Sequence, residues 1–275
     1  MTRRRTTALI GLTLFALIGR AGELPHAPVP GGIARVPLQA AADGPAPEVR
    51  YRGRRVLVLP QDGVWQAVVG LPLDAQPGRH ELLRDDTVLS FDIEDKQYPE
   101  QRLTVSDQRK VNPLPEDLRR IEHEQRTIRA ALNHYSATAP PDIFMPLPAA
   151  GPFSSPFGLR RFFNEQPRKP HSGLDIAAPM GTPVNAPLPA QVLAQGDYFF
   201  NGKTVLLDHG QGLVSMYCHL DRIAVRDGEK LNAGQQLGTV GKTGRVTGPH
   251  LHWGVALNGN LINPILLIKD NKLNN

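Results

Sequence analysis

The sequence predicts a mainly β protein in which an N-terminal antiparallel β sandwich, a helical linker and a C-terminal antiparallel β domain follow one another. Short runs of strand-forming residues, separated by turn residues, occupy both halves of the 275-residue chain. One helical pattern lies between these two regions. The composition, 40% hydrophobic and 21% charged, is typical of a globular protein and excludes a disordered or collagen-like chain.

We assign residues 22–112 to the N-terminal domain. Its first part, residues 22–48, is rich in Pro, Ala and Gly, and we expect it to be irregular. Short β-rich runs follow at 55–59, 64–69, 87–93 and 102–105. This spacing predicts a small antiparallel sandwich. Since the region contains no cluster of catalytic residue types, we expect it to act as a structural support or as a recognition module.

Residues 113–141 form the predicted helical linker. Pro115, Glu116 and Asp117 favour a helix start, because proline has the required φ and acids complement the helix dipole. The residues that recur on one side are Leu118, Ile121, Gln125, Ile128, Leu132 and Tyr135. About 20 helical residues reach about 30 Å, so the helix is either a spacer or a brace against a domain. His123-Glu124 is not an HExxH zinc motif, because Thr127 occupies the second ligand position.

Residues 142–268 read as one compact antiparallel β domain, and residues 269–275 as a tail. Glycine-rich turns separate β-rich runs at 191–195, 204–208, 213–219, 236–240 and 251–257. We predict no helix beyond about residue 160.

Residues 1–21 resemble a secretory signal peptide. They contain four Arg and no acidic residue, and the apolar run 8–18 is too short to span about 30 Å of hydrocarbon. We expect export to the periplasm or cell envelope with cleavage after about Ala21, and no stable membrane span afterwards; an uncleaved anchor is the alternative. Without this segment 27 basic and 26 acidic residues remain, which argues against a nucleic-acid partner.

Histidine and aspartate are concentrated in the second half of the chain. Because residues i and i+2 of a strand share a face, His250 and His252 should point the same way. The same alternation places His219 beside Tyr217 and puts Cys218 on the opposite face. We therefore expect two strands to direct three imidazoles into one cleft.

His171 and Asp175 extend this group, because Gly173 between them allows a tight turn. Imidazole and carboxylate ligands are typical of zinc sites that keep one position open for catalysis. A single cysteine, Cys218, excludes both a disulfide within the chain and a thiolate zinc ribbon. Any one of these histidines alone is more often a hydrogen-bonded structural residue than a metal ligand, but their co-occurrence favours a metal site.

Five sequence strings resemble those of the lysostaphin/LytM-type zinc metalloendopeptidases, which cut bacterial peptidoglycan. They are Ser155-Pro156-Phe157-Gly158, His171-Ser172-Gly173-Leu174-Asp175, Tyr217-Cys218-His219-Leu220, Gly241-Lys242-Thr243-Gly244 and Gly248-Pro249-His250-Leu251-His252-Trp253. The resemblance covers about residues 143–268, in the order typical of the family.

This resemblance implies a function and a role for each site residue. His171, Asp175 and His252 would hold one Zn²⁺ per chain, and His219 and His250 would be the catalytic pair that orients a zinc-activated water and stabilises the oxyanion. The implied activity is hydrolysis of amide bonds in peptidoglycan stem peptides or cross-links. No departure from the family pattern occurs at these five positions, and the resemblance says nothing of protein partners.

Other functions remain open at the level of sequence. The chain could be a non-enzymatic cell-wall-binding regulator that activates another peptidoglycan hydrolase, although such relatives lack ligands. A carrier domain for an acyl group is a second alternative, because Lys242 follows a glycine-rich stretch like that of a lipoyl or biotinyl carrier hairpin. Asn164 and Thr247 lie next to the motifs and could contact substrate or supply a fourth ligand.

Overall fold

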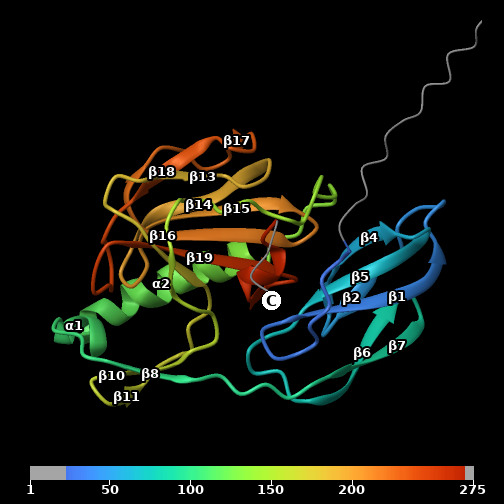
Figure 1. The fold of residues 1–275 in the computed structure, drawn as a ribbon, viewed down its shortest axis with the longest axis horizontal. Helices are drawn as coiled ribbons and strands as arrows, with labels where there is room; N and C mark the ends of the chain where they lie inside the picture. Colours follow the sequence, from blue (N-terminus) through green and yellow to red (C-terminus); the bar gives the residue numbers. More distant parts are fainter. Residues whose placement is uncertain (1–22, 270–275) are drawn as a thin grey trace, which may run out of the picture.

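The computed structural model describes residues 23–269 (Figure 1). The predicted signal peptide, and all of the predicted tail beyond Lys269, lie outside this range. None of the helices within residues 23–269 is long and apolar enough to cross a membrane. The mainly β fold class, with a helix between two β-rich regions, is confirmed.

The N-terminal region is a sandwich of two antiparallel sheets. One sheet contains β1 (Ile33–Ala41), β5 (Val64–Gly70) and β4 (Leu57–Gln61), in that order. The other contains β3 (Arg54–Arg55), β2 (Val49–Tyr51), β6 (Gly78–Arg84) and β7 (Thr87–Ile93). Buried side chains from both sheets, including Leu38, Tyr51, Val69 and Leu82, form one core between them.

Two details of the N-terminal prediction are wrong. Residues 22–48 are not irregular throughout, because they contain the nine-residue strand β1. Its Pro37 is tolerated because β1 is an edge strand, where the missing N–H is not needed on the open side. The run predicted at 102–105 is not a sandwich strand either: β8 (Glu100–Leu103) pairs in parallel with β10 (Arg160–Phe163), beside β11 (Gln166–Pro167).

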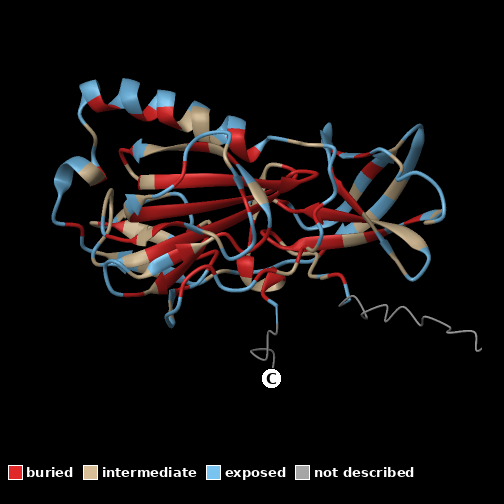
Figure 2. Ribbon diagram, turned by 90° about the horizontal axis from the view of Figure 1, so that it is seen from above, coloured by how far each residue is buried: buried red, intermediate tan, exposed pale blue. Residues whose placement is uncertain are grey.

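The linker region contains two helices, α1 (Gln108–Val111) and α2 (Pro115–Leu132). At the start of α2, the Asp117 carboxylate accepts a hydrogen bond from the Leu114 N–H at 3.1 Å. Helix α2 lies along the large C-terminal sheet as a brace, with a buried inner side and an exposed outer side (Figure 2). The predicted face is partly wrong: Leu118 is 53% exposed, and Tyr135 lies beyond the last helical residue.

The C-terminal region is built on one large antiparallel sheet. Its main path is β17 (Lys230–Leu231), β14 (Ala190–Tyr198), β15 (Gly202–Gly210), β16 (Leu213–Ile223), β19 (His250–Leu257), β12 (Leu174–Ala177) and β9 (Phe153–Ser155). Off this path, β13 (Pro183–Asn185) pairs with β18 (Gln236–Val240), β18 pairs with β16, and β20 (Asn260–Ile262) pairs with β19. Beyond residue 160, the described chain has one helical turn, the 3-10 helix η1 (Pro264–Leu267).

The two faces of this sheet have different cores. Tyr217, Leu251 and Trp253 are fully buried on one face, whereas Met216 and Cys218 lie on the other, beneath α2. The N-terminal sandwich is fastened to the same domain, since Ile33, Leu57 and Val68 join the first core. The Asn258 side chain also accepts from the Gly70 N–H at 2.7 Å and donates to the Gly70 carbonyl at 3.0 Å.

His209 on β15 is a buried histidine with a structural role. Its Nδ1–H donates to the Pro189 carbonyl at 3.1 Å, so Nε2 accepts from the Ser215 hydroxyl at 2.7 Å. Burial lowers the pKa of His209 to about 4. An unfolded histidine has a pKa of about 6.5. Between about pH 6.5 and pH 4, the unfolded chain therefore binds a proton at His209 that the native chain does not bind. Acid therefore favours unfolding through His209, by at most about 1.4 kcal/mol per pH unit.

We predict that His209→Gln reduces the fall in melting temperature between pH 6.5 and pH 4, even if it lowers the melting temperature at pH 7. The measurement is a thermal melt of zinc-loaded protein across this range. His123→Gln, which alters an exposed histidine on α2, is the matched control and should keep the wild-type slope. Equal slopes for wild type and His209→Gln would show that His209 does not resist protonation.

Candidate metal centre

Two neighbouring strands place the carboxylate beside an imidazole. On the antiparallel β12–β19 pair, Asp175 lies opposite His252 and Ala177 lies opposite His250. Side chains opposite one another across an antiparallel pair project from the same face. The register of these strands therefore brings Asp175, His250 and His252 to one side of the sheet.

His171 reaches the same point from the segment just before β12. A Cβ atom at Gly173 would lie 2.6 Å from Cε1 of His252, so only glycine allows the chain to pass this close to the ring. The glycine at position 173 is therefore required by this close approach, whereas the sequence predicts only a tight turn there.

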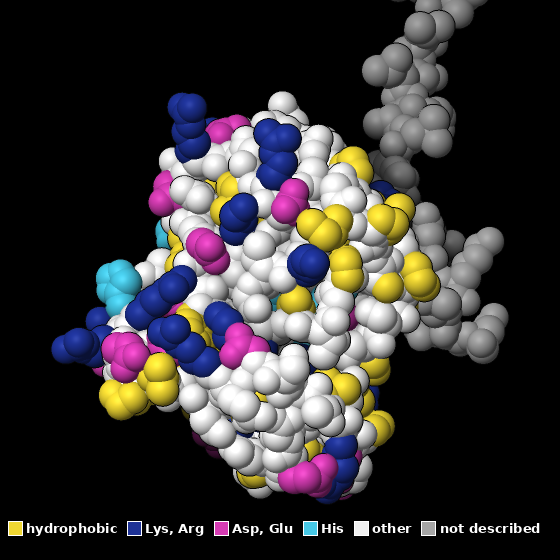
Figure 3. All heavy atoms as spheres, turned by 90° about the vertical axis from the view of Figure 1, so that its left-hand side faces the viewer, with side chains coloured by type: hydrophobic (Ala, Val, Ile, Leu, Met, Phe, Trp, Pro, Cys, Tyr) yellow, Lys and Arg dark blue, Asp and Glu magenta, His cyan; other side chains and the backbone are white. Residues whose placement is uncertain are grey.

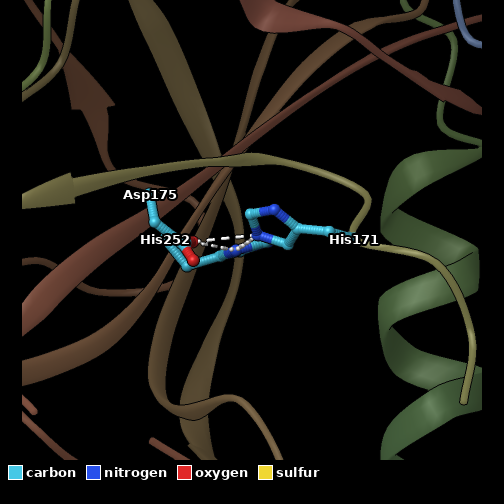
Figure 4. Close-up of side chains that lie close together, drawn as sticks. All are labelled: His171, Asp175 and His252. Atoms are coloured by element: carbon cyan, nitrogen blue, oxygen red, sulfur yellow. Dashed lines mark hydrogen bonds and ion pairs between the residues drawn. The ribbon is translucent and has the colours of Figure 1, made fainter. Parts of the chain in front are cut away.

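His171, Asp175 and His252 point toward one another (Figure 4). Asp175 Oδ1 lies 2.9 Å from His171 Nε2 and 2.8 Å from His252 Nδ1, and the two nitrogens are 3.0 Å apart. Their ligand atoms all lie within 4.8 Å of one another, and the three residues are almost completely buried. The geometry is that of three donors for one metal ion.

The hydrogen bond on the far side of His171 shows that a cation fits here. His171 Nδ1 is 2.7 Å from the Pro156 carbonyl, which can only accept, so Nδ1 carries the proton. In the neutral ring, Nε2 is then a lone pair that faces the carboxylate oxygen of Asp175. Two acceptors at 2.9 Å repel one another unless a proton or a metal ion lies between them. This donor set suits Zn²⁺.

The second oxygen of Asp175 has a partner that the sequence analysis did not assign. Arg161 on β10 donates from Nη2 to Asp175 Oδ2 at 3.2 Å and to Ser155 Oγ at 3.1 Å. Burial raises the pKa of Asp175, but His171 and His252, when their ring nitrogens carry protons toward the carboxylate, outweigh this and hold the pKa below its usual range. Arg161 follows the Ser155–Gly158 string in sequence, which was the available signal.

His219 joins the cluster through a β-bulge rather than through strand alternation. Cys218 pairs with His252 across β16 and β19, so Cys218, not Tyr217, shares the face of the cluster. The prediction that Cys218 lies on the opposite face is therefore wrong. His219 has a left-handed φ of 64°, and the β15–β16 register shifts here, which turns two successive side chains to the same face.

His219 and His250 lie side by side next to the three donors. Their ring centroids are 4.9 Å apart, and His219 is 6.0 Å from the ring of His252. Nδ1 of His219 donates to the Thr243 carbonyl at 2.9 Å, and Nδ1 of His250 donates to the Gly248 carbonyl at 2.9 Å. Both Nε2 atoms are thus left as acceptors. Burial lowers the pKa of His219 to about 3, which keeps its ring neutral at physiological pH.

A cavity of about 290 Å³ opens over the cluster. Asp175, His219, His250, His252 and Thr247 are among the residues that line it. The structure therefore brings all five predicted site residues together, with His171 at the rear.

Two other residues considered from the sequence, Asn164 and Cys218, do not have the role of a metal ligand or a nucleophile. The Asn164 side chain accepts from the Val105 N–H at 2.8 Å and donates to the Val105 carbonyl at 3.0 Å, so it ties two loops together instead of joining the donors. Burial raises the pKa of the Cys218 thiol to about 12, which leaves it protonated and unsuited to act as a nucleophile.

Both parts of the chain match models of one protein family. Residues 169–264 match the model of Peptidase family M23, and residues 26–96 match the model of the Peptidase family M23 N-terminal domain. The second match covers the sandwich described above.

Curated relatives include two peptidoglycan enzymes. The peptidoglycan DD-endopeptidase ShyA of Vibrio cholerae is 40% identical over 111 residues, which are 40% of this chain and 26% of that protein. The DD-carboxypeptidase/endopeptidase Mpg of Neisseria meningitidis is 38% identical over 112 residues, which are 41% of this chain and 26% of that protein. The match thus spans about a quarter of the length of these relatives.

A crystal structure from Pseudomonas aeruginosa, described as a peptidase M23, extends the similarity to both domains. It is 43% identical, with a TM-score of 0.75, and the match covers 88% of this chain and 96% of that one. Together with the two family models, this match shows that the chain belongs to peptidase family M23.

Proposed function

We propose that the chain is an exported zinc metalloendopeptidase that hydrolyses amide bonds in peptidoglycan stem peptides or cross-links. The observation that carries this proposal is the meeting of His171 Nε2, Asp175 Oδ1 and His252 Nδ1 at one point, beside two further imidazoles and beneath an open cavity. Membership of family M23 and the peptidoglycan activities named for the relatives support it.

In this proposal His171, Asp175 and His252 hold one zinc ion. Three protein ligands are typical of catalytic zinc, since they leave a position open for water or substrate. When bound, zinc supplies Lewis acidity, which lowers the pKa of water and polarises a carbonyl. Arg161 fixes the second oxygen of Asp175, and the Pro156 carbonyl fixes the tautomer of His171.

His219 and His250 would be the catalytic pair. Each has its Nδ1–H committed to a backbone carbonyl and an Nε2 that can accept a proton. A ring that has taken a proton from water can then donate it, either to the oxygen that becomes negative during attack or to the leaving nitrogen. The bulge at His219 places this ring next to His250 without displacing the ligands.

The other parts of the chain take supporting roles in the proposal. We retain residues 1–21 as a cleaved export signal, which would deliver the enzyme to the periplasm or cell envelope. We also retain residues 22–112, 113–141 and 142–268 as the N-terminal domain, the helical linker and the metallopeptidase domain.

The proposal predicts metal-dependent release of peptide products from purified peptidoglycan. Zinc-loaded protein should solubilise sacculi, a chelator should stop the release of peptides, and added zinc should restore it. The reason is that activation of water at this site requires the bound metal. The measurement is identification of the released muropeptides by mass spectrometry. A zinc-loaded protein that binds sacculi without releasing products would instead indicate the non-enzymatic regulator.

Substitutions of the proposed zinc ligands and of the proposed catalytic residues should have different effects on zinc content and on rate. His171→Ala and Asp175→Ala should lose stoichiometric zinc, whereas His219→Ala should keep zinc and lose at least about a hundredfold in rate. Bound zinc is measured by plasma mass spectrometry, and rate by muropeptide turnover. His123→Ala, on the exposed side of α2, is the control. Full turnover by His219→Ala would remove His219 from the mechanism.

The close approach at Gly173 gives a further test of the ligand geometry. In Gly173→Ala the new methyl group would lie 2.6 Å from His252 Cε1, so the ring must shift. We expect zinc affinity to fall about tenfold or more, as when the support of a ligand is removed. Gly44→Ala, where a Cβ meets no atom within 4 Å, is the control. Zinc affinity equal to wild type in a competition titration would mean that the position of His252 does not depend on Gly173.

A further inference from the structure

Arg245 lies in the loop between β18 and β19, at the mouth of the candidate metal centre. Its side chain lines the cavity that contains Asp175, His219 and His252. It also lines a second cavity, of about 340 Å³, which continues from His219 and His252 to Leu132 on α2. Arg245 is therefore placed where the two halves of one groove meet at the proposed zinc ligands.

The guanidinium of Arg245 is held in a fixed position. Its central carbon lies 4.4 Å from the ring centroid of Phe200 and 4.9 Å from that of Phe163. Nη1 donates to the Lys110 carbonyl at 3.3 Å. A planar cation packed against two rings has lost most of its rotamer freedom before it meets a ligand.

This cation lacks a counter-charge. Within residues 23–269, no carboxylate lies within 4.0 Å of Arg245, whereas the exposed Arg102, Arg109, Arg120 and Arg126 each have at least one. Figure 3 shows the same mixture of Lys or Arg with Asp or Glu on one outer face. Burial, together with the nearby Arg161 and Arg168, lowers the pKa of Arg245 to about 10. It remains charged at neutral pH.

The groove as a whole is positively charged. The cationic side chains that line the two cavities are Arg129, Arg161, Lys169 and Arg245. Among the described residues that line the two cavities, Asp175 is the single acidic one. Its carboxylate oxygens already contact His171, His252 and Arg161. A ligand that supplies a negative charge beside Arg245 would balance this wall.

We propose that Arg245 binds a free carboxylate of the substrate peptide and so selects peptides that carry one close to the bond that is cut. This inference rests on the proposed function, which it deepens by naming the substrate class. The guanidinium offers two parallel N–H donors to a carboxylate, and a carboxamide cannot accept both. Charge-assisted pairs of this kind change affinity by about ten- to a hundredfold.

The test compares two cross-linked muropeptides that differ only in a free carboxylate and its carboxamide. Their kcat/KM values are measured with wild type, Arg245→Gln, Arg245→Lys and the exposed surface control Arg226→Gln. Wild type and Arg226→Gln should prefer the carboxylate peptide by at least about tenfold. Arg245→Gln should lose this preference by losing activity on the carboxylate peptide alone, and Arg245→Lys should recover part of it.

Three results would overturn the proposal: a wild-type enzyme without the preference, an Arg245→Gln variant that keeps it, or an equal loss on both peptides, which would assign Arg245 to structure alone. Melting temperatures of all variants identify misfolding. If wild type hydrolyses neither peptide, the proposed function fails separately. Binding of the two peptides to zinc-loaded wild type and Arg245→Gln, measured by calorimetry, then decides the role of Arg245 by the same comparison.

Discussion

The repulsion between unshared lone pairs at one buried point is the constraint on which the site depends. The Nδ1–H of His171 donates to the Pro156 carbonyl, and the other ring nitrogen, Nε2, faces Asp175. Burying acceptors face to face is costly unless a cation joins them. A proton on His171 Nε2 or a metal ion relieves this repulsion, and the two imidazoles and the carboxylate form a donor set that suits a metal ion.

The fold holds these atoms in place with backbone geometry. The β12–β19 register sets Asp175 opposite His252, and the absence of a side chain at Gly173 lets the His171 segment approach the same ring. The opposite face of the sheet is filled by Trp253, Tyr217 and Leu251, which are fully buried. Because Asp175 and His252 are on strands backed by a packed core, the fold itself fixes their positions.

Much of this arrangement could be predicted from sequence, because His250-x-His252 and His171-x3-Asp175 are local patterns with direct geometric meaning. His219 lies in the cleft as predicted, but through a bulge rather than through strand alternation, and a bulge with a left-handed residue leaves no clear trace in a pattern of alternating residues. The sequence also could not show β8 beside β10, because that parallel pairing joins segments 60 residues apart. Arg161 and Arg245 were missed because their roles come from tertiary neighbours rather than from spacing.

The N-terminal sandwich was harder to predict than the site. Its first strand contains a proline and follows a segment rich in Ala, Gly and Pro, so composition concealed an edge strand that pairs with β5. The sandwich is also not independent of the metallopeptidase region, since Ile33, Leu57 and Val68 belong to the C-terminal core. A boundary drawn from composition alone does not show this shared packing.

Anomalous X-ray scattering at the zinc edge, from crystals of the zinc-loaded protein, tests the central claim most directly. The account predicts one strong peak, about 2.0–2.2 Å from His171 Nε2, His252 Nδ1 and a carboxylate oxygen of Asp175. A peak bound by other residues, or none at these three atoms in protein that contains zinc, would contradict it.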